Sequence, residues 1–74
     1  MIPLSFLMPG EKGVVVEIKG GRGLVRRLYG MGLYPSAVVE VVSHGFGPLL
    51  VRVNGTTTIA IGRGIGMKIM VRRV

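Results

Sequence analysis

Few residues in this chain of 74 could take part in acid–base or nucleophilic chemistry. There is one histidine, His44, and the acidic residues are three glutamates, Glu11, Glu17 and Glu40. Cysteine and aspartate are absent. A nucleophile, a base and an orienting group would have to combine His44 with Glu17 or Glu40, and no spacing in the sequence favours such a set. We therefore expect that the protein is not an enzyme.

Metal and phosphate sites are not indicated either. The chain has neither an HxxxH nor a CxxC spacing, so we expect no metal and no cofactor. His44 is expected to be a solvent-exposed turn residue, with a ligand shared between two copies as the alternative. The Gly21-Arg22-Gly23 turn lies between a predicted strand and a predicted helix, as the GxGxxG turn of a dinucleotide-binding fold does, but Arg26 occupies the position of the third glycine. A Walker A phosphate-binding loop is also absent. This segment is interpreted as a tight turn into a helix.

The basic residues leave three interpretations open. The formal net charge is +7, which favours anionic partners. The cations form two clusters along the chain, Arg22, Arg26 and Arg27 in one and Arg63, Lys68, Arg72 and Arg73 in the other. They could form a solvated face, an acidic-protein docking surface or a nucleic-acid surface. Base-stacking aromatics are missing from the predicted strands, so nucleic acid is the weakest of the three.

Alternation of apolar residues predicts five strands, at 13–19, 37–43, 49–53, 56–61 and 67–72. In the first of these, Val14, Val16 and Ile18 are expected to face the core. Asn54-Gly55 predicts a type I′ hairpin turn, since both positions require a positive φ. The segment 62–66 is expected to be a glycine-rich corner.

One helix is expected between the first two strands. Leu24, Leu28 and Met31 recur at helical spacing, whereas Arg26 and Arg27 fall on the opposite side. Glycines and Pro35 follow as a C-terminal stop. Five short strands and one helix after the first strand predict a mainly β fold, a closed or nearly closed small barrel forming one domain over 1–74.

A second apolar surface is expected opposite the core. Several large apolar residues alternate with the core set: Val15, Val38, Val42, Leu50 and Met70. The N-terminal segment and the helix could cover some of them, or the surface could pack against another protein or a second copy. Charges and glycines interrupt every apolar run, so no membrane span is expected. No signal-peptide pattern is recognised, and a cytoplasmic location is expected.

The sequence resembles the FeoA family over nearly its whole length. The resemblance is densest in Arg27-Leu28-x-x-Met31-Gly32-Leu33-x-Pro35 and resumes at Gly47-Pro48-Leu49-x-Val51. Two positions depart from the pattern. Ser36 stands where the family commonly has glycine, and Gly66 stands where alanine is usual.

The resemblance implies an SH3-like β-barrel with an inserted helix and a non-enzymatic accessory role. FeoA-like proteins are thought to dock on the cytoplasmic side of FeoB, a GTP-binding membrane transporter for ferrous iron, so membrane contact would be indirect. No cofactor is firmly implied. The family is also similar to the C-terminal SH3-like domain of iron-dependent repressors, but this chain has no room for their DNA-binding helices.

A partner-binding patch is hypothesised at the end of the helix and the turn after it. It would comprise Arg26, Arg27, Tyr29, Met31, Leu33 and Tyr34. Aromatic and arginine side chains are common anchors in protein interfaces. The alternatives are a nucleic-acid-binding small barrel of the KOW or ribosomal kind, and a self-assembling interaction module.

Overall fold

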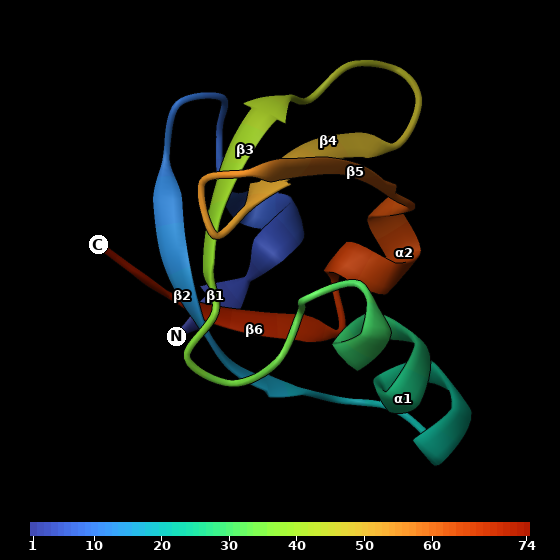
Figure 1. Cartoon of the computed structure of the whole chain (residues 1–74). Coiled ribbons are helices and arrows are strands. Elements are labelled where there is room, and N and C mark those ends of the chain that lie inside the picture. The colour runs from blue at the N-terminus through green and yellow to red at the C-terminus, as the bar shows by residue number, and fades with distance from the viewer.

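The computed structural model describes all residues, 1–74, and is mainly β. Six strands form one antiparallel sheet in the order β1-β6-β2-β3-β4-β5. Their bounds are β1 Ile2–Pro3, β2 Lys12–Ile18, β3 Val38–Ser43, β4 Leu49–Val53, β5 Thr57–Ile61 and β6 Ile69–Arg73. Figure 1 shows the sheet curled around its interior, with helix α1 (Arg22–Gly30), which connects β2 to β3 along the chain, at the lower right of the view. The predicted mainly β small barrel with a helix is confirmed. Five strands were predicted and six are present: β1 was not predicted, so α1 follows the second strand and not the first.

Two short elements near the open side of the barrel were not predicted. The 3₁₀ helix η1 (Leu4–Phe6) follows β1, and α2 (Arg63–Gly66) occupies the segment expected to be a simple corner. No pairing joins the edge strands β1 and β5, so the barrel is nearly closed rather than closed. Ser5 Oγ donates a hydrogen bond to the Arg63 carbonyl at 2.8 Å, which ties η1 to α2. These two elements together fill part of the opening.

The expected core face of β2 is wrong. The register between β2 and β6 shifts between Val15 and Glu17, which is a β-bulge. A bulge inserts one extra residue and reverses the alternation beyond it. Val15, only 1% exposed, therefore lies in the core, whereas Val16 is exposed and Ile18 packs against the core from its edge. Val15 accordingly does not belong to the second apolar surface.

The remaining strands follow the predicted alternation. Fourteen buried apolar residues form one core, to which β3 contributes Val39 and Val41 and β4 contributes alternate residues. Asn54 and Gly55 have φ values of 51° and 76°, which confirms the predicted hairpin turn. On the outer side of the sheet, the side chains of Val38, Val42 and Leu50 stay exposed. No helix combines the length and the apolar character that a membrane crossing needs.

Candidate docking surface on helix α1

Helix α1 divides into a face that packs on the barrel and a face that is open to solvent. Leu28 is buried, and Leu24 and Met31 pack against the core from its margin, as their spacing predicted. Four residues at positions i, i+3, i+4 and i+7 form the opposite side. We refer to them as the α1 stripe: Arg22, Val25, Arg26 and Tyr29.

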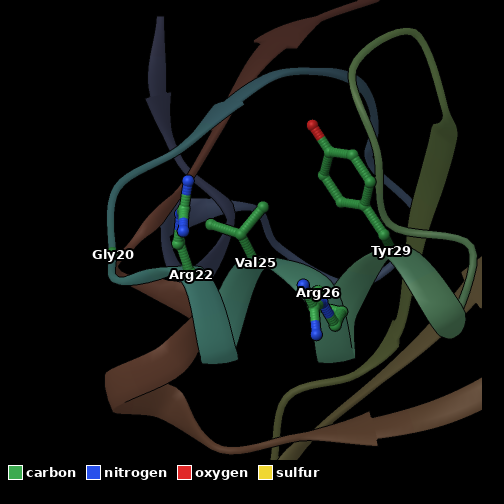
Figure 2. A pocket seen from close by; sticks show the side chains of 5 residues that line it. All are labelled: Gly20, Arg22, Val25, Arg26 and Tyr29. Atoms are coloured by element: carbon green, nitrogen blue, oxygen red, sulfur yellow. The ribbon is translucent and has the colours of Figure 1, made fainter.

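The α1 stripe lines a shallow, open hollow of about 490 Å³ together with Gly20. In Figure 2 Val25 lies between Arg22 and Tyr29, and the Tyr29 ring leans over the hollow. Arg26 projects from the next turn of the same helix. The hollow thus combines an apolar floor with two guanidinium groups, which is the composition of a surface that pairs apolar contact with anionic recognition.

The arginines of α1 have no counter-ion within the protein. The two salt bridges of the molecule are Arg52–Glu40 at 3.3 Å and Arg73–Glu11 at 3.1 Å, both away from α1. No acidic residue lies in the first turn of α1, and no side chain caps its N-terminus. The helix N-terminus itself carries partial positive charge, which adds to the field of Arg22. The surface is therefore cationic and uncompensated.

Two tyrosines stand beside the arginines in a fixed arrangement. The rings of Tyr29 and Tyr34 are 6.5 Å apart and meet edge to face at 74°. Asn54 Nδ2 donates to the Tyr34 hydroxyl at 3.3 Å, while Asn54 Oδ1 accepts from the Val38 amide at 3.0 Å. The β4–β5 turn thereby holds Tyr34. Tyr29 and Tyr34 remain 46% and 40% exposed, so both rings are available to a partner.

The expectation that Leu33 lies on the surface is wrong, because this side chain is 0% exposed. Helix α1 ends in a Schellman motif around Gly32, whose φ is +90°. The Leu33 amide donates to the Leu28 carbonyl at 2.9 Å and the Gly32 amide to the Tyr29 carbonyl at 3.0 Å. In this motif the residue after the glycine packs back on the helix, so Leu33 enters the core.

The other residues of the hypothesised patch differ in exposure and in whether they line the hollow. Arg26 and Arg27 are exposed, as expected, while Met31 is half-buried against the core. Arg27 is not among the residues that line the hollow. The patch hypothesis left out Arg22 and Val25. Counting back from Tyr29 at helical spacing would have found both, since they share its side of the helix.

Outside α1, polar groups serve local structure. His44 Nε2 donates to the Ser5 carbonyl at 2.8 Å, so this half-buried side chain links the 43–48 turn to η1 and is not the exposed turn residue expected. Glu11 Oε1 accepts from the Met8 amide at 2.7 Å. This hydrogen bond, with help from Arg73, holds the pKa of Glu11 below its usual 4.5. No three His, Cys, Asp or Glu residues lie close enough together to hold a metal ion.

The sequence matches the model of the FeoA domain over residues 2–73. The chain belongs to the FeoA family. It is 41% identical over 71 residues to "Putative Fe(2+) transport protein A" of Methanocaldococcus jannaschii, covering 96% of this chain and 85% of that protein. The resemblance noted in the sequence is thus confirmed.

Solved structures agree with this assignment. A crystal structure of an iron uptake regulatory protein, FeoA, superposes with a TM-score of 0.90 at 41% identity and covers 99% of this chain and 96% of that one. FeoA of Stenotrophomonas maltophilia, complexed with zinc and described as an SH3 domain protein, gives a TM-score of 0.82 at 26% identity, covering 97% and 91% of the two chains. The expected SH3-like fold is confirmed.

A manganese-dependent transcriptional repressor shares the fold alone. It superposes with a TM-score of 0.89 at 19% identity, and the match covers 97% of this chain but 36% of the repressor. The present chain therefore corresponds to one part of that larger protein.

Proposed function

We propose that this FeoA-family protein is a non-enzymatic accessory protein of ferrous-iron transport. In this proposal it docks through helix α1 on the cytoplasmic GTPase region of a FeoB-type membrane transporter. Family membership and the name of the Methanocaldococcus jannaschii relative support the transport role. Docking would place the protein at the cytoplasmic face of the membrane through its partner.

The observation that carries the docking site is the pairing of uncompensated arginines with exposed aromatic rings on α1. Arg22 and Arg26 flank Val25 and Tyr29, and no carboxylate of this chain reaches them. Arginine and tyrosine are enriched among the residues that contribute most to protein–protein affinity. The net charge of +7 favours an acidic partner surface and speeds encounter with it.

Calorimetry with the purified GTPase region of the cognate transporter tests this proposal. Arg22→Gln plus Arg26→Gln should weaken binding by more than about tenfold, because it removes the central cations of the interface. Lys12→Gln plus Arg72→Gln is the matched control: it removes the same charge at exposed strand positions away from α1. Equal losses in both variants would show that net charge, and not the α1 stripe, governs binding.

Salt dependence separates this proposal from the nucleic-acid alternative. Contact with several phosphates would lower affinity for RNA or DNA by about 10³-fold or more between 50 and 200 mM salt. We expect only weak nucleic-acid binding that does not depend on the α1 stripe, since no strand offers a stacking platform. Tight nucleic-acid binding abolished by the α1 substitutions would overturn the proposed function.

A further inference from the structure

The two edges of the sheet differ in their protection against another strand. An edge strand exposes unpaired backbone groups, and proteins protect such edges with short strands, proline, charge or bulges. At one edge, β1 has two residues and includes Pro3. At the other edge, β5 has five residues, Thr57–Ile61, with no proline and no charge. It pairs with β4 over its whole length without a register shift, so none of these devices protects it.

The hydrogen-bond pattern identifies the backbone groups that are open. The Asn54 amide donates to the Val38 carbonyl at 2.8 Å, which directs the even-numbered residues at this end of β4 toward β3. Odd-numbered residues of β4 then face β5, and their partners Thr57, Ile59 and Ile61 face back. The N–H and C=O groups of Thr58 and Ala60 consequently point away from the sheet. No backbone hydrogen bond outside the helices and strands involves residues 57–61.

Positive charge borders this open edge. On the outer face of the sheet, a cross-strand row runs from Lys12 through Glu40 and Arg52 to Thr58, with charges of alternating sign until the edge. The Arg52 side chain remains 42% exposed in spite of its ion pair. Arg63 lies two residues after the other end of β5, and its guanidinium donates only to the neutral carbonyls of Gly45 and Gly47. A strand added here would meet a cation near each end.

We propose that the edge of β5 binds an extended acidic polypeptide segment, which joins the sheet as an additional strand. Backbone hydrogen bonds to Thr58 and Ala60 would supply the pairing, and acidic side chains would complement Arg52 and Arg63. A second copy of this chain fits the edge poorly, because it would bring together two molecules of charge +7 without offering a carboxylate in β5. The site is separate from the α1 stripe and does not depend on its proposed partner.

Amide hydrogen exchange of the full chain, followed by NMR, tests the β5 site with synthetic peptides. The probe is a peptide of about seven residues in which glutamate alternates with valine, long enough to span a strand. We expect it to slow exchange at Thr58 and Ala60. A peptide with lysine in place of glutamate should bind at least about tenfold more weakly, because the cations at the edge repel it.

Two substitutions at one position separate backbone pairing from side-chain contact. Ala60→Pro removes an outward N–H and should weaken peptide binding by about tenfold, whereas Ala60→Val keeps the N–H and should retain binding. Spectra of both variants establish that the fold is intact. Arg22→Gln plus Arg26→Gln should keep the peptide affinity within about threefold of the parental value. Failure of the β5 proposal can therefore be distinguished from failure of the proposed docking of α1 on the transporter.

Three outcomes would overturn the proposal. The first is that amide exchange at Thr58 and Ala60 is not slowed by the peptide at about 1 mM, which would mean that the dissociation constant exceeds about 1 mM. The second is peptide-induced change confined to α1. The third is protection of the same amides that rises with protein concentration alone, which would identify a second copy as the occupant.

Discussion

Helices α1 and α2 begin with the same local sequence and serve different purposes. Each starts after an extended glycine, Gly21 or Gly62, and continues Arg-Gly followed by an aliphatic residue. Helix α1 then runs for nine residues and leaves Arg22 without a counter-ion, whereas α2 stops after four. Arg63 of α2 donates to the carbonyls of Gly45 and Gly47 in the neighbouring loop.

The comparison shows that the local sequence is enough to begin each helix. The segments packed beside the helix determine which partners its first arginine has. In α1 the apolar residues after the start recur at helical spacing and allow the helix to continue along the barrel. In α2 the next apolar residues begin to alternate with the period of β6, so only one turn forms. The Arg63 guanidinium donates to two carbonyls of the neighbouring loop, whereas the Arg22 side chain forms neither a hydrogen bond nor an ion pair. We therefore expect substitution of Arg22 to affect binding and substitution of Arg63 to affect stability.

The segment directly after α1 should give the largest effect of substitution on stability, because one of its side chains, Leu33, is buried in the core. Leu33→Ala removes a fully buried side chain and should lower the free energy of unfolding by about 2–5 kcal/mol. Tyr34→Ala, at the adjacent exposed position, should cost about 1 kcal/mol or less. Urea unfolding measures both. Similar losses at the two positions would contradict the division of this segment into a buried and an exposed side.

A substitution at the end of α2 tests the packing of α2 against η1 at the opening of the barrel. A Cβ at Gly66 would clash with Ser5 Oγ and lie 3.1 Å from Leu49 Cδ1. Gly66→Ala should therefore destabilise the protein by about 1–3 kcal/mol. Adding Ser5→Ala removes the clashing oxygen and should recover part of the loss in thermal unfolding. If the double variant were the less stable one, tight packing against η1 would not be the cause.

The equivalent arginines give the most direct comparison of the two helices. Arg63→Gln removes hydrogen bonds to two carbonyls and should lower the free energy of unfolding by about 1 kcal/mol. Arg22→Gln, at the same position of α1, should change it by no more than about 0.5 kcal/mol. Denaturant midpoints are the readout. An equal effect at both positions would mean that the loop carbonyls do not distinguish the two helices.

The turn after α1 offers a stabilising change. Ser36 has a φ of 83°, in the left-handed region that costs a residue with a side chain about 1–2 kcal/mol. Ser36→Gly should raise the free energy of unfolding by about 0.5–1 kcal/mol, since the greater freedom of unfolded glycine offsets part of the gain. Ser43→Gly, at the end of β3, is the control and should destabilise. Loss of stability in Ser36→Gly would refute the strain at this turn.

The smallest effect concerns acid stability and lies outside both helices. Because the pKa of Glu11 is lower in the folded chain, the unfolded chain takes up this proton first as the pH falls. The contribution is complete above the usual value of 4.5 and is lost as the pH falls through the lower folded value. Glu11→Gln should thus flatten the loss of stability in acid, as urea midpoints across pH would show. Glu17→Gln is the matched control, since it removes the same charge at an exposed position without an ion pair.

The sequence alone was enough to predict the fold class, the helix and most strands. Alternation in β3 and β4 placed Val39, Val41 and Val51 correctly, and Asn54-Gly55 identified the hairpin. These features are local, because each depends on spacing within a few residues. The family resemblance rests on residues of the same segments.

Only the tertiary structure decided which side chains form the surfaces. The bulge in β2 depends on pairing with β6, and it moved Val15 into the core against the simple alternation. The burial of Leu33 depends on how the chain folds back on α1 after Gly32. The different fates of Arg22 and Arg63, and the open edge at β5, depend on neighbours distant in sequence. The spacing of apolar residues defines a local helix or strand. The exposure and hydrogen-bond partners of its side chains depend on which distant parts of the chain pack beside that element.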